Sequence, residues 1–204
     1  MNQPFASIVA AGVLALATPL AFAAVAAGQA APDFGLTDIQ GKKRSLSEFK
    51  GKYVVLEWFN SQCPFVQKHY ESGNMQGLQR KYGDKGVVWL TINSTSLDSS
   101  HYRDPARSQT IVKEWKIAAA ALMLDADGTV GKAYGARTTP HLWVIDPQGK
   151  VIYTGGIDDR ATFRAADVQE ARNYVAAALD ESMAGKAVAT PAAAPYGCSV
   201  KYKY

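Results

Sequence analysis

The chain has 204 residues, a length that suits one domain with appendages. Hydrophobic residues make up 48% of it and charged residues 20%, the proportions of a globular protein. The net charge is +4, but the 22 basic residues are scattered without a Lys/Arg block, which argues against a nucleic-acid partner.

Residues 1–23 are predicted to be a secretory signal peptide. Residues 5–27 form an uncharged, Ala-rich run that contains Ala21-Phe22-Ala23, a small-x-small cleavage pattern, although no Lys or Arg precedes it. The alternative is an uncleaved membrane anchor, which Pro19 and the many alanines disfavour. We therefore expect a periplasmic or secreted protein, in a compartment where disulfides persist, and membrane attachment only if the leader is uncleaved.

The first half of the chain predicts strands and helices in alternation. Two short segments joined by a turn, 33–36 and 43–45, predict an N-terminal β-hairpin. Residues 53–59 are apolar on both faces, as in a buried central strand. The further elements expected are helices 63–72, 74–82, 104–115 and 130–134, and strands 87–93 and 121–125.

The second half predicts a second hairpin and a closing helix. Residues 141–146 and 151–154 flank a Pro-Gln-Gly-Lys turn. Asp167 is predicted to cap the last helix, with Glu170 completing a capping box and Gly185 ending the helix. This order predicts an α/β fold, in which a central mixed sheet has helices on both faces and a hairpin at the N-terminus.

Cys63 stands where the predicted central strand runs into a helix. The N-terminus of a helix presents unpaired backbone N–H groups and the positive end of the helix dipole, and both favour a thiolate over a thiol. Pro64 suits the first helical turn because proline lacks the N–H group that would have no partner there. The pattern favours a reactive thiol, and the alternative is a half-buried structural cysteine.

Glu57 lies in the middle of the predicted central strand, where an unpaired charge would be costly. Burial should raise the pKa of its carboxyl group and suit it to move protons near neutral pH. The alternative is a salt bridge to a lysine such as Lys52 or Lys132.

Residues 185–204 are predicted to be a flexible tail that carries Cys198, the second of two cysteines. Within the tail, residues 186–195 are a Pro- and Ala-rich spacer. The stretch from Gly185 to Cys198 could span about 40 Å, whereas the radius of gyration of such a domain is about 15 Å. Cys198 can therefore reach almost any point on the surface, Cys63 included.

The chain resembles the thioredoxin superfamily, and more closely its peroxiredoxin-like branch, grouped with alkyl hydroperoxide reductase/thiol-specific antioxidant domains. The resemblance covers about residues 31–160 and resumes in the tail. It implies a thioredoxin-like domain over residues 29–184. The segments that carry it are residues 32–38, the Cys63 junction, and residues 133–141, 146–151 and 196–201.

The resemblance also implies roles for single residues. Cys63 takes the first position of the thioredoxin Cys-x-x-Cys motif, but Val66 fills the second, so a resolving thiol is missing from the helix. By the same match Glu57 takes the place of the buried carboxylate of thioredoxins. Pro140 takes the place of their cis-proline, which agrees with a proline that enters a strand from a loop.

Typical peroxiredoxins differ from this chain around the reactive cysteine. They carry Thr three residues before that cysteine and Pro four residues before the Thr, whereas this chain has Asn60 and, by that match, Leu56. Asn60 could still donate a hydrogen bond. The activating arginine has Arg137 as its candidate.

The leading hypothesis is an exported thiol oxidoreductase that acts by thiol–disulfide exchange. Cys63 would be the nucleophile, Glu57 would move the proton and Cys198 would resolve the intermediate. The partners would be a thiol or disulfide protein substrate and a thiol reductant. The residues expected to shape the substrate groove are Pro140, Thr139, Pro64 and Asn60.

Two alternatives stay open. One is an antioxidant peroxidase, in which Cys63 reduces a hydroperoxide and becomes a sulfenic acid. The other is a non-catalytic binding domain in which a Cys63–Cys198 disulfide is a structural link.

No cofactor or metal is expected, because two cysteines and three dispersed histidines match no zinc or haem spacing. His69 is predicted to be a surface residue, on the helix face opposite Cys63. His141 follows Pro140 and is a candidate for a group near the thiol.

Overall fold

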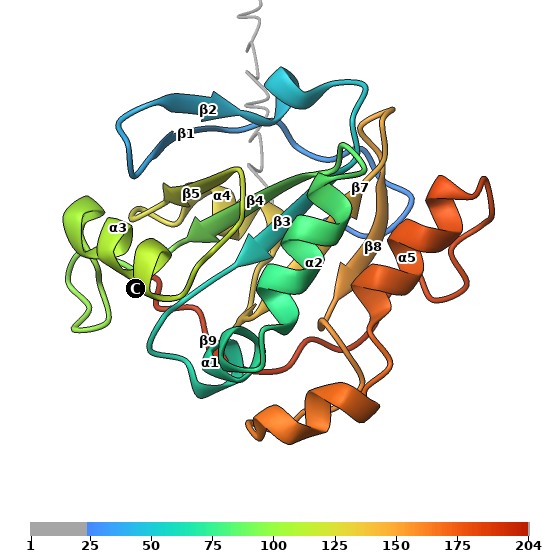
Figure 1. The fold of residues 1–204 in the computed structure, drawn as a ribbon. Coiled ribbons are helices and arrows are strands. Elements are labelled where there is room, and N and C mark those ends of the chain that lie inside the picture. Colours follow the sequence, from blue (N-terminus) through green and yellow to red (C-terminus); the bar gives the residue numbers. More distant parts are fainter. Residues whose placement is uncertain (1–23, 204) are drawn as a thin grey trace, which may run out of the picture.

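The structure is a computed structural model and describes residues 24–203. The predicted leader, residues 1–23, lies outside this part. In the described part, seven strands form one sheet in the order β2-β1-β5-β4-β3-β7-β8 (Figure 1). Their bounds are Gly35–Asp38 (β1), Lys43–Ser45 (β2), Val54–Trp58 (β3), Val88–Asn93 (β4), Ala121–Leu124 (β5), His141–Ile145 (β7) and Val151–Gly155 (β8).

The central strand β3 is buried at every position, because it has a strand on each side and helices on each face. It pairs in parallel with β4 and antiparallel with β7. β1 and β2 form the N-terminal hairpin, and β7 and β8 form the second one. The predicted mixed sheet and both predicted hairpins are therefore confirmed.

Helices cover both faces of the sheet (Figure 1). On one face α1, α2, α3 and α5 pack over a cluster that includes Cys63 and Val55. On the other, α4 and the segment before β1 pack over a cluster that includes Trp58 and Trp143. The bounds are Pro64–Glu71 (α1), Asn74–Gly83 (α2), Pro105–Glu114 (α3), Thr129–Tyr134 (α4) and Tyr174–Met183 (α5), with short 3₁₀ helices at Leu46–Phe49 and Ala165–Glu170.

The start of the last helix differs from the prediction. Asp167 lies inside the 3₁₀ helix Ala165–Glu170, and the hydroxyl group of Thr162 and the guanidinium group of Arg164 engage its carboxylate. The chain is extended at Ala171, and α5 begins after Asn173, whose side chain accepts a hydrogen bond from the Ala176 amide. Asp167 and Glu170 therefore do not cap this helix.

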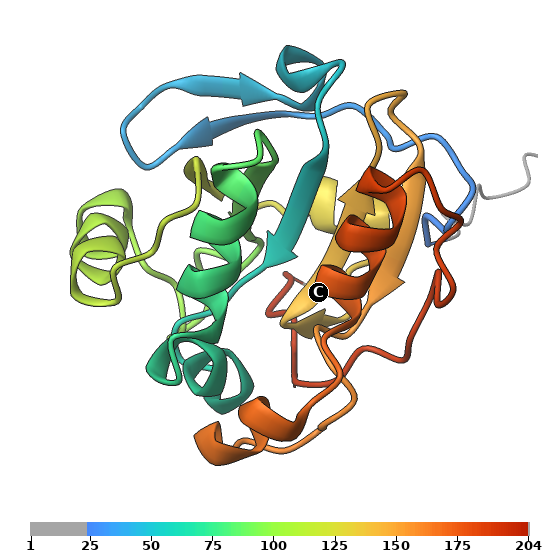
Figure 2. The ribbon, with the colours of Figure 1, turned by 45° about the vertical axis from the view of Figure 1, so that its right-hand side comes forward.

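The tail is seated along the domain instead of projecting from it as a flexible spacer. It passes beside β8, where the Thr154 amide donates to the Pro191 carbonyl group at 3.1 Å (Figure 2). It then forms the strand Cys198–Ser199 (β9), which pairs antiparallel with Thr138–Thr139 (β6). The Pro- and Ala-rich composition of residues 186–195 predicted a flexible spacer. Composition does not predict backbone hydrogen bonds, and these hold the tail on the domain.

Further along, the tail joins the core of the sheet's other face. Val200 is buried there, and its amide donates to the Arg137 carbonyl group at 3.0 Å. The Ser96 amide donates to the Lys201 carbonyl group at 2.8 Å.

None of the helices within residues 24–203 has the length and apolar character of a membrane-spanning segment.

One glycine permits the tail to lie against β8. Gly155 has a φ of +147°, and a Cβ atom there would collide with the Ala193 backbone. Gly149 also has a positive φ, +81°, but a Cβ atom on it would meet nothing within 4 Å. Gly149 is therefore a control for a Cβ atom at a positive φ, and the alkylation of Cys198 tests the contact with the tail separately.

We expect Gly155→Ala to lower the free energy of unfolding by roughly 1 kcal/mol more than Gly149→Ala, because both variants strain the backbone but only the first displaces the tail. Denaturant unfolding measures the two losses. Alkylation of Cys198 should also become faster in Gly155→Ala alone. Equal losses with unchanged alkylation would mean that the contact at Gly155 does not hold the tail.

Candidate functional site

Cys63 is the residue immediately before α1, at its N-cap position. The turn from β3 delivers it there, because the Cys63 amide donates to the Asn60 carbonyl group at 3.0 Å. The Cys63 carbonyl group accepts from the Gln67 amide at 2.9 Å, which closes the first turn of the helix, with Pro64 at its start. The predicted junction of strand and helix is confirmed, but Cys63 is only 1% exposed.

The Thr139–Pro140 peptide faces the Cys63 thiol. This bond is cis, and both residues are buried. The Cys63 thiol donates a hydrogen bond to the Thr139 carbonyl oxygen, with Sγ and oxygen 2.9 Å apart. Residues from the α1 junction and from the loop before β7 therefore meet at one point.

Cys198 completes this arrangement. In the pairing of β9 with β6 it lies directly opposite Thr139, the residue whose carbonyl oxygen accepts the Cys63 thiol, so the two cysteines are neighbours. Burial and the neighbouring Cys63 sulfur raise the pKa of the Cys198 thiol. Both cysteines are free thiols. Two adjacent thiols can form a disulfide with the release of two electrons and two protons.

Glu57 lies on the face of β3 that α1 and α2 cover. Its carboxylate accepts hydrogen bonds from the Tyr70 hydroxyl at 2.9 Å, the Trp89 indole N–H at 2.8 Å and the Thr91 hydroxyl at 3.3 Å. Gln79 donates a longer one at 3.4 Å. Burial raises the pKa of Glu57 to about 7, although these hydrogen bonds oppose the shift.

Neutral donors, not a cation, surround Glu57. Among the ion pairs of the described residues it has neither Lys52 nor Lys132 as a partner, so the salt-bridge alternative is wrong. Its hydrogen bonds reach Tyr70 on α1 but neither cysteine. A proton that passes between Glu57 and a thiol would need a water molecule between them.

Asn60 and Pro64 occupy different surroundings. Asn60 is buried, its side-chain oxygen accepts from the Gln62 amide at 2.8 Å, and its side-chain nitrogen donates to Thr95 at 3.2 Å. Both ends of the Asn60 amide therefore serve the turn before Cys63. Pro64 is exposed beside Cys63.

Of the groups considered from the sequence, His141 lies on the face of the sheet opposite the Cys63 thiol. His141 packs against Trp143 on the far face of the sheet, with ring centroids 4.0 Å apart. Side chains alternate along a strand, and the neighbouring Leu142 belongs to the cluster that contains Cys63. Burial lowers the pKa of His141 to about 3, and Arg137 is exposed.

His69 is fully buried, so its prediction as a surface residue is wrong. The reason is the tail, which covers this side of α1 and places Tyr196 against the ring. His69 Nε2 lies 3.1 Å from the Tyr196 hydroxyl, which donates to Asp158 at 2.5 Å. Lys68 is also buried, and its Nζ lies 3.8 Å from Asp158.

Sequence reasoning missed this cluster, which we call the latch: Lys68, His69, Asp158 and Tyr196. Its members come from α1, the segment after β8, and the tail, so no local spacing links them. The tail motif Tyr196-Gly197-Cys198 was the one available signal, since it sets an aromatic residue two positions before a cysteine.

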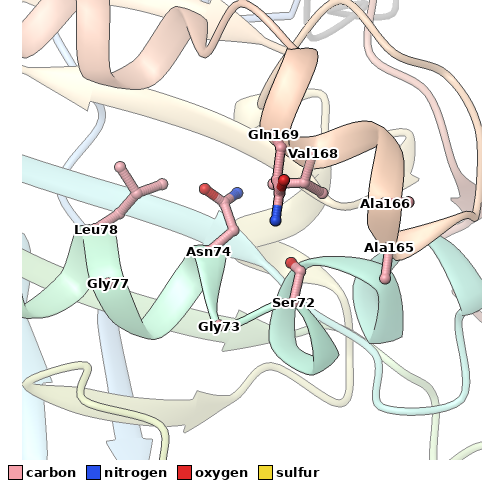
Figure 3. A pocket seen from close by; sticks show the side chains of 9 residues that line it. All are labelled: Ser72, Gly73, Asn74, Gly77, Leu78, Ala165, Ala166, Val168 and Gln169. Atoms are coloured by element: carbon pink, nitrogen blue, oxygen red, sulfur yellow. The ribbon is translucent and has the colours of Figure 1, made fainter.

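A separate hollow of about 570 Å³ opens between the start of α2 and the 3₁₀ helix Ala165–Glu170 (Figure 3). The side chains of Asn74 and Gln169 face it. None of its lining residues belongs to the predicted site. Within residues 24–203, no group of His, Cys, Asp and Glu side chains could hold a metal ion.

The family assignment follows from residues 27–154, which match the model of the AhpC/TSA family. The chain belongs to the AhpC/TSA family. The matched range includes Glu57, Cys63 and Pro140. It excludes α5 and the whole tail, so Cys198 lies outside the part by which this AhpC/TSA member is assigned.

Three known proteins are similar to this AhpC/TSA member. A thiol-disulfide oxidoreductase ResA from Bacillus thuringiensis subsp. konkukian is 33% identical over 125 residues, 61% of this chain and 66% of that protein. The match thus spans slightly less than two thirds of the relative's length. An uncharacterized conserved protein from Geobacillus kaustophilus has a TM-score of 0.75 at 27% identity, covering 87% of this chain and 92% of its own.

The third comparison shows the fold. The thioredoxin domain of a thiol-disulfide oxidoreductase from Bacteroides vulgatus has a TM-score of 0.53 at 24% identity, and the match covers 72% of this chain and 98% of that domain. The AhpC/TSA member therefore has a thioredoxin-like fold, as the resemblance predicted.

We expect Glu57→Gln to remove a pH dependence of stability. In the wild type the pKa of Glu57 is about 7 when folded and 4.5 in its ordinary state, so the folded chain binds the extra proton in this window. Wild-type stability should therefore fall as pH rises from about 4.5 to 7, by up to about 3 kcal/mol relative to Glu57→Gln.

Urea unfolding of both proteins at pH 4, 6 and 8 measures this difference. The comparison cancels the opposite trend from His69 and His141, whose pKa values are lowered to about 3 and whose contribution is the same in both proteins. A difference that stays constant across the pH range would show that Glu57 keeps its ordinary protonation.

Proposed function

We propose that the protein is a thiol oxidoreductase that exchanges disulfides with a protein substrate, with Cys63 as the nucleophile and Cys198 as the resolving cysteine. The observation that carries the proposal is the meeting of both cysteines at Thr139, whose carbonyl oxygen accepts the Cys63 thiol and which lies opposite Cys198 in the pairing of β9 with β6. Residues 135 positions apart in the sequence are in contact there, and neither is linked to another cysteine.

In the reductive direction, the Cys63 thiolate attacks a substrate disulfide. One substrate sulfur leaves as a thiolate and takes up the proton that Cys63 lost, and a mixed disulfide forms. Cys198 then gives up its proton and attacks the Cys63 sulfur. The second substrate sulfur leaves and takes that proton, so the substrate gains two electrons and the chain holds a Cys63–Cys198 disulfide. A dithiol reductant restores the two thiols by the same exchange.

The raised pKa of Cys198 supports this order. Burial and the Cys63 sulfur hold the proton on Cys198 by raising its pKa. Cys198 would therefore act second, once Cys63 is bound to the substrate and no longer carries negative charge.

Glu57 is proposed to exchange protons with the site. A pKa of about 7 lets the carboxyl group both accept and release a proton near neutral pH. The proposed substrate groove is shaped by Thr139, Pro140, Pro64 and Asn60. Because Cys63 is 1% exposed in the presence of the tail, β9 must move away from β6 before a protein substrate can reach the thiol.

The relatives support the reaction. The ResA protein of Bacillus thuringiensis is named a thiol-disulfide oxidoreductase. We propose the same chemistry for this chain, with a thiol or disulfide protein as substrate and a thiol as reductant. We also propose export, with residues 1–23 as leader and the periplasm or the exterior as destination.

A second candidate is antioxidant reduction of a hydroperoxide, which the AhpC/TSA assignment favours. The Cys63 thiolate would attack the hydroperoxide, the O–O bond would break, and the products would be a sulfenic acid on Cys63 and an alcohol. Cys198 would then condense with the sulfenic acid to give a disulfide and water. The hydrogen bonds of Asn60 to Gln62 and Thr95 count against this candidate, because they already engage both ends of the amide that would have to hold a peroxide oxygen.

We expect Cys198→Ser to stop the reaction at its first covalent stage. With a disulfide substrate this variant should accumulate a mixed disulfide at Cys63, because the second attack lacks a sulfur. Turnover with a dithiol reductant should fall at least tenfold. Cys63→Ser is the matched control and should neither turn over nor carry an adduct at residue 63. Intact-mass spectrometry after acid quench identifies each species.

The same measurements decide between the candidates. Fast consumption of hydroperoxide by the wild type, with sulfenic acid trapped in Cys198→Ser and no mixed disulfide, would favour the peroxidase. A wild-type disulfide that resists a glutathione buffer, with a potential below about −300 mV, would indicate a structural link. The proposed exchange requires a disulfide that glutathione reduces reversibly.

A further inference from the structure

The tail is attached to α1 two residues before Cys198. The Tyr196 hydroxyl donates to Asp158 at 2.5 Å and lies 3.1 Å from His69 Nε2. Asn74 Nδ2 lies 3.0 Å from the other ring nitrogen of His69. An amide nitrogen can only donate, so His69 Nδ1 accepts, and Nε2 of the neutral ring carries the proton that it donates to Tyr196.

These contacts form one directional chain of donors. Asn74 donates to His69, His69 to Tyr196, and Tyr196 to Asp158. Burial lowers the pKa of His69 to about 3, so its ring stays neutral and the direction is fixed at physiological pH. Buried hydrogen-bond chains of this kind hold their members in one geometry, because an unpaired partner would be costly.

Lys68 is the fourth residue of the latch and supplies its positive charge. Its Nζ donates to the Arg160 carbonyl group at 2.6 Å and lies 3.8 Å from Asp158 and 5.4 Å from the centroid of the Tyr196 ring. Lys68, His69 and Asp158 are each at most 3% exposed. The charge of Asp158 is thereby balanced inside the protein, next to the tail.

The connection from Tyr196 to Cys198 is short and closely fitted. Gly197, the residue between them, has a φ of +134°, and a Cβ atom on it would overlap the Thr139 carbonyl oxygen. That oxygen is the acceptor of the Cys63 thiol. Three consecutive residues therefore make three different contacts. Tyr196 belongs to the latch, Gly197 passes against the Thr139 carbonyl group, and Cys198 lies beside Cys63.

We infer that Tyr196, Asp158 and His69 are positioning residues, which hold Cys198 against Cys63 and so set the equilibrium between the dithiol and the disulfide. This inference rests on the proposed function of the two cysteines. Helix α1 has Cys63 at its N-cap and contains Lys68 and His69. The latch therefore fixes the tail to the helix that presents the nucleophile.

The physical effect is one of effective concentration. When the latch holds the tail at Tyr196, Cys198 is already near Cys63 before the disulfide forms. When the tail is loose, disulfide formation must also order it, which costs conformational entropy. The pairing of β9 with β6 covers only two residues on each strand, and the backbone hydrogen bonds of Val200 and Lys201 hold the chain after Cys198, so the latch is the anchor on the side before it.

The test is Tyr196→Phe, which removes the hydroxyl and keeps the ring that packs on Phe65. The matched control is Tyr134→Phe, which removes a phenol hydrogen bond to Pro32 on the other face of the sheet. Redox titration in glutathione buffers, followed by acid quench and mass spectrometry, gives the equilibrium constant for disulfide formation in each protein.

We expect Tyr196→Phe to lower this constant about tenfold, a rise of about 30 mV in reduction potential, and Tyr134→Phe to leave it within about twofold of the wild type. Thermal unfolding confirms that both variants fold. In a Cys63→Ser background, Tyr196→Phe should also speed alkylation of Cys198 several-fold, a readout that needs no redox chemistry.

The outcomes separate the two claims. A wild-type chain that forms no Cys63–Cys198 disulfide overturns the proposed function, and the redox role of the latch with it. A wild-type chain that forms the disulfide, while Tyr196→Phe shifts neither its equilibrium nor the alkylation of Cys198, overturns the latch alone.

Discussion

The approach of three segments to the Thr139 carbonyl group organises the candidate site. The oxygen accepts the Cys63 thiol, the residue pairs with Cys198 through β9, and Gly197 passes so close that no side chain fits. The second contact needs the third, since β9 can lie on β6 only if residue 197 lacks a Cβ atom. The position of the second cysteine therefore depends on backbone contact and not on proximity in sequence.

Helix α1 joins two buried polar environments of opposite character. On one side Tyr70 donates to Glu57 in a pocket of neutral donors, where burial raises the pKa of the carboxyl group to about 7. On the other side His69 and Lys68 face Asp158, whose charge has a cation nearby. An apolar helix would have packed the same sheet, so the polar residues of α1 serve the groups around it.

Most of the fold could be predicted from the sequence because local patterns determine it. The apolar run of β3, the turn between β7 and β8, and Pro64 after Cys63 each define an element within a few residues. The start of α5 could not be predicted in this way. Asp167 and Glu170 fit a capping box as well as Asn173 fits an N-cap, and only tertiary contacts of Asp167 with Thr162 and Arg164 decide between them.

In the candidate site, too, the residues that follow from local patterns could be predicted and those that depend on tertiary contacts could not. Cys63, Glu57 and Pro140 were identified because each breaks or ends a local pattern. The burial of His69 and the partners of Tyr196 depend on a tail whose composition resembles a free linker. The sequence could establish that Cys198 was able to reach Cys63, but the path of the tail depends on backbone hydrogen bonds to β8 and β6.

The covalent connection between the two thiols has one vulnerable stretch. Residues 186–195 are mostly exposed and lie outside every helix and strand of the described chain, while the sheet and α1 lie wholly before them. A protease that cut this stretch would break the covalent link between the two cysteines and leave Cys198 on a short segment held by its noncovalent contacts with β6 and α1. Dissociation of that segment would leave a protein with a single uncovered cysteine, able to form an adduct but without the second sulfur needed to release it.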